Sequence, residues 1–163
     1  MKSRIEMKRG GQRGAAALEF AFVAMFVLIP LVLGTWQLGK AISEYNTLTK
    51  AVRDGTRYLT QHEPGTRTEA ALCLVKYGKV EVAADGKATC SGSLLLPNLA
   101  EATIGICEAT SCEATHADVV VPGAGRINLA TVTISNYRYA SWVPSFIADI
   151  TFNPISNTMR AMP

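Results

Sequence analysis

The sequence predicts an α+β protein in which a long N-terminal transmembrane and stem helix packs on a small antiparallel sheet. Three observations predict this fold. Residues 15–38 are almost continuously apolar, residues 39–63 continue with a helical apolar stripe, and residues 64–163 alternate short strand patterns with turn residues. We therefore expect a basic leader at residues 1–14, a transmembrane helix, an amphipathic stem helix and a small extracytoplasmic domain.

The apolar segment AAALEFAFVAMFVLIPLVLGTWQL, from Ala15 to Leu38, is long enough to cross a membrane. As a helix it spans roughly 36 Å, and a hydrocarbon core is about 30 Å thick. A helix also pairs its own backbone groups, which lipid requires. Trp36 falls where an interfacial aromatic residue is expected, and Pro30 is expected to kink the helix or be tolerated within it.

Positive charge is concentrated at the start of the chain. The formal net charge is +3, and five basic residues lie among the first thirteen: Lys2, Arg4, Lys8, Arg9 and Arg13. A basic segment before a membrane span keeps the N-terminus in the cytoplasm, so the residues after the span lie outside it. We expect the leader to be disordered, and we read its charge as a topology signal that requires no nucleic-acid partner.

A cleaved secretory signal peptide is the main alternative for this segment, because it also begins basic and becomes apolar. Three features argue against it. The apolar run is longer than a usual signal core, Glu19 lies within it, and the stretch from Gly34 to Lys40 contains no clear small-x-small cleavage site. We therefore expect the helix to remain as a membrane anchor.

Glu19 is the only charged residue of the apolar run. A carboxylate at the centre of a membrane helix costs about 2.5–3.5 kcal/mol on insertion scales. Glu19 is near the start of the run, so it can reach the cytoplasmic interface, or it can pair with a cation. If the chain were cut after Gly14, the new amino group of Ala15 in a neighbouring subunit would supply that cation and fix the register of packed helices.

The segment Gly14-Ala15-Ala16-Ala17-Leu18-Glu19-Phe20, followed by a long apolar run, resembles the processing site of type IV pilin-like proteins. In that superfamily a prepilin peptidase cuts after the glycine, and a glutamate is the fifth residue of the mature chain, as Glu19 would be. The Glu19-Phe20 pair resembles the tight adherence (Tad, or Flp) branch. Major Flp pilins are much shorter than this chain, whereas TadE-like minor pseudopilins are similar in length.

Two weaker segments support the resemblance. Residues 51–58, AVRDGTRY, are similar to the A-x-R-x-G-A-R-x segment of TadE-like proteins but depart from it at Thr56, where the family has a small apolar residue. The patterns between residues 132 and 160 resemble the terminal strands of the family. Residues 66–125 match no family pattern, so the resemblance covers roughly half of the chain.

The resemblance implies a structural, non-enzymatic role in initiating or assembling a Tad pilus and, through it, in cell adhesion. Gly14 and Ala15 would form the processing site, and Glu19 and Phe20 would serve assembly and register. The implied partners are a prepilin peptidase, other pilins and pseudopilins, the Tad inner-membrane platform and membrane lipid. The chain would cross the bacterial inner membrane once, with its C-terminal domain in the periplasm or carried into the pilus. The alternative is an uncleaved, membrane-anchored periplasmic binding module.

Four cysteines follow the apolar run: Cys73, Cys90, Cys107 and Cys112. An even number outside the cytoplasm favours disulfides over free thiols. Three pairings are possible. Cys73 with Cys90, and Cys107 with Cys112, would close the shortest loops, but the sequence does not decide between the three.

The sequence offers no convincing active site. His116 follows Cys107 and Cys112, but a zinc site would need a fourth ligand and usually a tighter cysteine spacing. His62 adjoins the end of the stem, where we expect it to be solvated. Since no nucleophilic triad, phosphate-binding loop or carboxylate pair can be assembled, we expect no catalytic residue, no metal and no cofactor.

The remaining elements are predicted from apolar periodicity and turn residues. We expect the stem helix to end before Pro64-Gly65, and the next helix to begin with Thr68 as N-cap and stop at Gly78. The other expected elements are a hairpin joining residues 79–82 to 88–90, a loop over residues 91–116 with a short helix near residues 99–102, and strands at residues 118–121, 127–139 and 146–160.

Overall fold

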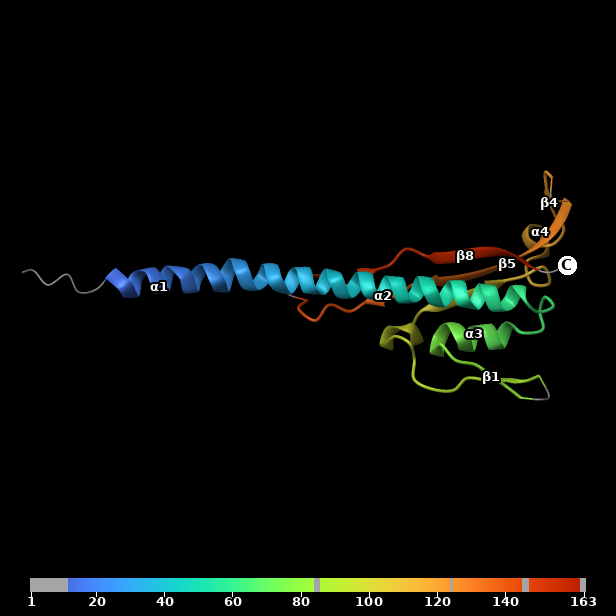
Figure 1. Ribbon diagram of the computed structural model, residues 1–163, viewed down its shortest axis with the longest axis horizontal. Coiled ribbons are helices and arrows are strands. Elements are labelled where there is room, and N and C mark those ends of the chain that lie inside the picture. The colour runs from blue at the N-terminus through green and yellow to red at the C-terminus, as the bar shows by residue number, and fades with distance from the viewer. Residues whose placement is uncertain (1–11, 84–85, 124, 145–146, 162–163) are drawn as a thin grey trace, which may run out of the picture.

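The computed structural model describes residues 12–83, 86–123, 125–144 and 147–161. One long helix forms its axis, and an α+β domain packs on the C-terminal half of that helix while the N-terminal half projects away (Figure 1). The predicted architecture, a long helix on a small antiparallel sheet, is therefore confirmed. Residues 1–11 of the leader, which was expected to be disordered, lie outside the described residues.

The axis comprises α1 (Gln12–Val23), a π-helical turn (Ala24–Leu28) and α2 (Ile29–Thr60). Pro30 stands at the start of α2. A proline has no N–H to donate and its ring crowds the carbonyl four residues back, so a regular α-helix is disturbed there. The π-helical turn, in which the Ile29 amide donates to the Ala24 carbonyl, ends two residues before Pro30, so the helix is locally irregular at the proline rather than simply tolerating it.

Helix α3 (Thr68–Tyr77) lies beside α2 (Figure 1). Its bounds were predicted, and Gly78 ends it in the left-handed conformation with φ 69°. The predicted N-cap was wrong. Arg67 holds the cap position, and the Thr68 hydroxyl donates instead to Glu108.

The hairpin predicted after α3 is confirmed, with β1 (Glu81–Val82) antiparallel to β2 (Ala88–Thr89). The stretch expected to be a loop is more ordered than predicted. The short helix expected near residues 99–102 is present as a 3-10 helix at Pro97–Ala100, and the strand β3 (Thr103–Cys107) and the short helix α4 (Glu113–His116) were not predicted. Ile104 and Ile106 of β3 are half-buried and alternate with exposed residues, and this short strand pattern is masked by the small polar residues around it.

The main sheet is antiparallel and centred on β5 (Gly125–Ser135), which bonds to β3 on one side and β8 (Ile155–Ala161) on the other. Strand β4 (Val119–Val121) pairs with the first residues of β5. The strand predicted over residues 127–139 is interrupted at Asn136, whose φ is 58°. Beyond it, β6 (Arg138–Tyr139) pairs with β7 (Ile150–Thr151) in a separate ribbon.

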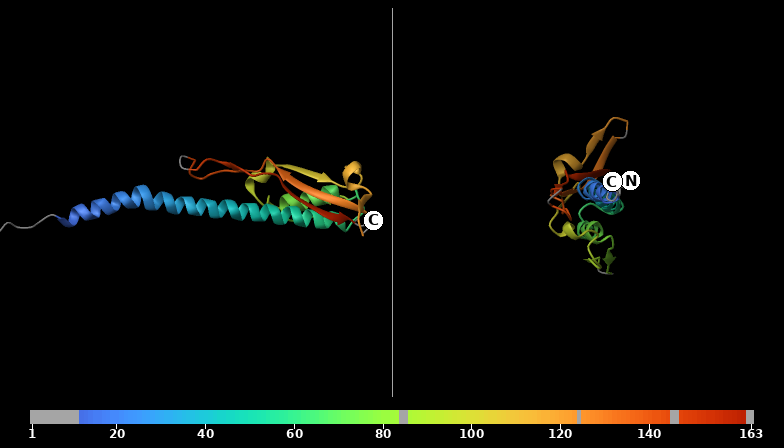
Figure 2. Two further views of the ribbon diagram at one scale, coloured as in Figure 1. Left: turned by 90° about the horizontal axis from the view of Figure 1, so that it is seen from above. Right: turned by 90° about the vertical axis from the view of Figure 1, so that its left-hand side faces the viewer.

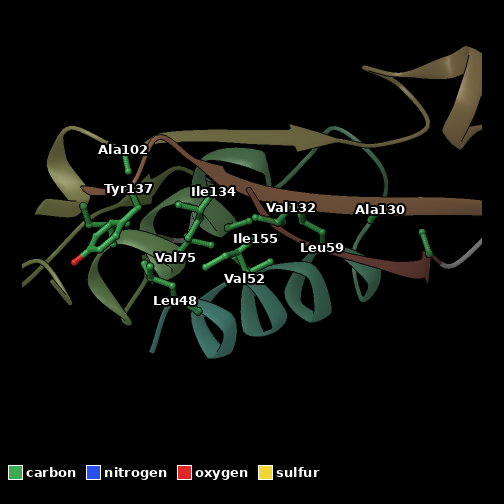
Figure 3. Close-up of a cluster of buried hydrophobic side chains, with 14 residues drawn as sticks. Leu48, Val52, Leu59, Val75, Ala102, Ala130, Val132, Ile134, Tyr137 and Ile155 are labelled. Atoms are coloured by element: carbon green, nitrogen blue, oxygen red, sulfur yellow. The ribbon is translucent and has the colours of Figure 1, made fainter. Parts of the chain in front are cut away.

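The core lies between the sheet and the C-terminal half of α2 (Figure 3). Leu48, Val52 and Leu59 of α2 meet one face of β5 and β8, and α3 closes the cluster from the side. Most of the apolar stripe predicted for the stem therefore faces the domain. The largest fully buried apolar side chains from the rest of the chain are Val75, Leu99, Val132, Ile134 and Tyr137.

Candidate assembly surface on the N-terminal helix

The first half of the long helix carries an exposed apolar surface. Its most apolar 18-residue window has a mean hydropathy of 2.5, and none of that window is buried by the rest of the chain. Phe20 and Phe26 are each 67% exposed. By length and composition this helix can anchor the protein in a membrane. The other large apolar residues exposed along it, up to Leu38, are Leu18, Phe22, Val23, Met25, Val27, Leu28, Ile29, Leu31, Val32, Trp36 and Leu38 itself.

Gly14 and Ala15 lie in α1 and are exposed. A Cβ atom added to Gly14 would meet nothing within 4 Å. A glycine inside a helix costs about 0.5–1 kcal/mol relative to alanine. No contact among the described residues requires a glycine at this position, so packing within that part of the chain does not account for it.

Glu19 and Phe20 follow on the same exposed helix. The ion pairs among the described residues are Arg126–Asp118 and Arg138–Asp149, both in the domain. Within that part of the chain Glu19 therefore has no salt-bridge partner. A carboxylate on an apolar helix without an internal counter-charge is open to one supplied from outside.

The segment AVRDGTRY lies on the half of α2 that packs on the domain. Thr56 is completely buried, and its hydroxyl donates to the Val52 carbonyl at 2.8 Å and lies 3.3 Å from the Asn157 carbonyl of β8. Gly55 lets α3 approach, because a Cβ there would lie 2.5 Å from Val75 Cγ2. The polar residue that departs from the family pattern is thus satisfied inside the core.

Two disulfides link the cysteines in the pairing that closes the shortest loops. Cys73 of α3 bonds to Cys90 after β2, and Cys107 of β3 bonds to Cys112, with Cα–Cα distances of 4.9 and 5.4 Å. His116 brings a ring nitrogen within 4.8 Å of the second pair. Sulfur bound in a disulfide is not a thiolate ligand, and the His116 ring bonds to the hydroxyls of Thr115 and Thr131 at 2.7 and 2.8 Å.

Sequence reasoning missed two polar residues that hold segments together. Glu108 is 3% exposed and accepts hydrogen bonds from the Gly65 amide and the Thr68 hydroxyl, at 3.2 and 3.1 Å. It thereby joins the end of the stem to the loop after β3. Gln37, at the end of the apolar run, is 2% exposed and contacts the loop between β6 and β7. An amide among apolar residues was the available signal for Gln37.

Residues 14–57 match the family model described as TadE-like protein. The matched segment begins at Gly14 and includes Glu19, the apolar surface and most of the AVRDGTRY segment. Comparisons with curated protein sequences and with solved structures find no match.

Proposed function

We propose that this chain, whose residues 14–57 match the TadE-like family model, is a minor pseudopilin that helps to initiate or assemble a Tad (Flp) pilus. The observation that carries the proposal is the form of the long helix. Its most apolar 18-residue window is not buried by the rest of the chain, while its second half is fixed to a disulfide-bonded domain. The exposed apolar surface of such a helix can contact lipid and other helices. The role is structural and uses no catalytic residue.

The first step of this function is cleavage by a prepilin peptidase between Gly14 and Ala15. Gly14 makes no packing contact that requires a glycine, which supports a role in recognition by another protein. Its exposure on the helix surface is compatible with access by a protease. Cleavage would remove the basic leader and leave a positively charged amino group on Ala15.

The second step is the pairing of helices in register. In this mechanism Glu19 accepts the charge of the Ala15 amino group of a neighbouring pilin, and Phe20 packs in the adjoining apolar contact. Each charge is costly alone in the membrane, and a close pair offsets much of that cost. Because the pair forms only at one relative position of the two helices, it selects that position.

The proposed location is the bacterial inner membrane, with the N-terminus in the cytoplasm and the domain in the periplasm. The basic leader supports that orientation, and two disulfides suit an oxidising compartment. The proposed partners are the prepilin peptidase, other pilins and pseudopilins, and the Tad inner-membrane platform. Entry of the protein into the fibre would follow from the same helix contacts.

The proposal is tested by the intact mass of the protein purified from its native membranes, with and without a reductant. We expect a chain that begins at Ala15 and gains about two hydrogens for each disulfide on reduction. A Gly14→Leu variant should keep its leader. Gly39→Leu is the matched control, because a side chain there also meets nothing within 4 Å, and it should be processed normally.

A full-length mass for the wild-type chain, in cells with a working prepilin peptidase, would contradict maturation. The uncleaved membrane-anchored periplasmic binding module would then be the better description. Equal processing of the Gly14→Leu and Gly39→Leu variants would likewise exclude Gly14 as the recognised residue.

A further inference from the structure

We propose that the loop between β6 and β7 lies in the periplasmic membrane interface, beside the transmembrane helix, and contacts lipid. This β6–β7 loop comprises the described residues 140–144 and 147–149. The inference rests on the membrane anchoring in the proposed function and adds to it a second membrane contact, made by the domain. Figures 1 and 2 show the orange-red loop running back along the helix, away from the sheet.

The loop reaches the level of the apolar run. Ile147 Cδ1 lies 4.0 Å from the position that a Gly34 Cβ would occupy. Pro30, which lines the groove between the helix and the loop, lies eight residues before Leu38, the predicted end of the span. At about 1.5 Å per residue this places it about 12 Å inside the span along the helix axis. Part of the loop is therefore at membrane depth if the span ends where the apolar run ends. A groove of about 220 Å³ between helix and loop is lined by Pro30, Leu33, Gly34, Gln37, Val143 and Ile147.

The side chains on this part of the loop suit an interface. Trp142 is 72% exposed and meets Trp36, itself 53% exposed, edge to face with ring centroids 5.9 Å apart. Lys40 lies 6.0 Å from the centroid of the Trp36 ring. Tryptophan is enriched where membrane meets water, and lysine places its charge on the aqueous side. Two exposed indoles side by side have no role inside the domain, and lipid headgroups would cover both.

Hydrogen bonds to Gln37 hold the loop at this depth. With its side-chain Oε1 turned to the loop, Gln37 accepts from the Val143 and Trp142 amides at 2.9 and 3.1 Å, and its nitrogen donates to Ser141 Oγ at 2.9 Å. An amide facing hydrocarbon without partners would be costly. The loop satisfies the Gln37 amide, and Gln37 in turn accepts from the Trp142 amide and adds a second acceptor for the Val143 amide, which also donates to Ser141 Oγ at 3.3 Å.

The charged side chains near the loop, Arg138 and Asp149, lie where the loop joins β6 and β7. Arg138 of β6 and Asp149 form an ion pair of 2.8 Å, and the Ser141 amide donates to Asp149 at 2.9 Å. The loop is thus polar where it joins the β6–β7 ribbon and apolar where it meets the span. This polarity runs in the same direction as that of the helix beside it, which favours lipid as the occupant over a soluble partner.

The chain contains only two tryptophans, so each can be observed alone. Trp36→Phe leaves Trp142, and Trp142→Phe leaves Trp36, with an aromatic ring kept at both sites. Each full-length variant would be placed, one copy per disc, in phosphatidylcholine–phosphatidylglycerol nanodiscs with plain or brominated acyl chains. We expect brominated lipid to lower the emission of both tryptophans at least about twofold, as residues at the membrane interface should show.

The outcomes separate this inference from the proposed function. Quenching of Trp36 without quenching of Trp142 overturns the loop contact and leaves the membrane anchor standing. Quenching of neither contradicts the anchor itself. Emission from Trp142 that escapes bromine but shifts to the blue when two or more copies are loaded per disc identifies a second copy as the occupant, which also overturns the proposal.

A third variant tests the attachment of the loop. Gln37→Leu keeps the span apolar but removes the hydrogen bonds to the loop, so Trp142 quenching should fall while Trp36 quenching is unchanged. Unaltered Trp142 quenching in this variant would contradict the role given to Gln37.

Discussion

Tyr137 donates a hydrogen bond to Glu44 Oε2 over 2.8 Å, which joins the turn after β5 to the stem helix across 93 residues of sequence. The tyrosine is 1% exposed, and its ring stacks on Phe152 with centroids 5.6 Å apart. Burial, the hydrogen bond and the charge of Glu44 raise the pKa of Tyr137 well above its ordinary value of 10.0. The protonated phenol is therefore part of what holds the helix on the sheet.

This contact predicts an alkaline loss of stability. Because the folded pKa of Tyr137 is raised, its contribution is complete below the unfolded pKa of about 10 and is lost as pH rises toward the folded value. We expect Tyr137→Phe to lower the free energy of unfolding by about 1 kcal/mol at neutral pH and to flatten its fall above about pH 10. Urea denaturation of the detergent-solubilised full chain from pH 7 to 11 measures both.

Burial also raises the pKa of Tyr139, so part of the alkaline fall should remain in the Tyr137→Phe variant. Tyr77→Phe serves as the control, since Tyr77 is a half-buried tyrosine of α3. The same flattening in the Tyr77→Phe variant would show that the effect does not come from the Glu44 contact.

Gly55 is expected to be the least tolerant glycine of the long helix. A methyl group there would lie 2.5 Å from Val75 Cγ2, and Val75 is completely buried. We expect Gly55→Ala to cost about 1–3 kcal/mol through overpacking. Gly39→Ala is the matched control because its Cβ has open space, and it should stabilise the helix by about 0.5–1 kcal/mol.

A double-mutant cycle identifies the clash. In a Val75→Ala background the cost of Gly55→Ala should shrink, because the methyl that blocks it has been removed, and the coupling should exceed about 0.5 kcal/mol. Purely additive free energies from thermal or urea unfolding would show that the cost of Gly55→Ala has another origin.

The long helix, α3 and the first hairpin were predictable because their signals are local. An apolar run, a helical stripe ended by Gly78 and an alternating pattern around a turn each act within a few residues. Strand β3 was missed because its two half-buried isoleucines, Ile104 and Ile106, are embedded in small polar residues and become a strand only by pairing with β5. The break at Asn136 likewise lies inside a continuous strand pattern.

The tertiary contacts of the candidate site were predictable only in part. Glu19 and Gly14 could be identified from the sequence alone, because Glu19 is the only charged residue of the apolar run and Gly14 directly precedes that run. The partner of Gln37 is more than a hundred residues away, in a loop whose path no local pattern specifies. Thr56 departs from the family segment, and the second contact that satisfies its hydroxyl, the Asn157 carbonyl, is also remote in sequence.

The two disulfides should contribute unequally to stability. Cys73 and Cys90 are separated by 17 residues and Cys107 and Cys112 by 5. Loop-closure entropy then predicts about 3 kcal/mol for the first bridge and about 2 kcal/mol for the second. We expect the Cys73→Ala/Cys90→Ala variant to unfold at lower urea than Cys107→Ala/Cys112→Ala. The reverse order would mean that the second bridge acts by holding Glu108 and the end of the stem in place.

Removal of the Glu19 charge should separate folding from assembly. Glu19 is exposed and has no ion pair among the described residues, so Glu19→Ala and Glu19→Gln should leave the free energy of unfolding within about 0.5 kcal/mol of wild type. Membrane insertion should be unchanged or improved, because a charge has been removed from an apolar helix. Pilus output should nevertheless fall, since the neighbouring amino group would have no carboxylate to pair with. Membrane fractionation and counts of assembled fibres in the same cells measure the two effects, and full pilus output from both variants would refute the register mechanism.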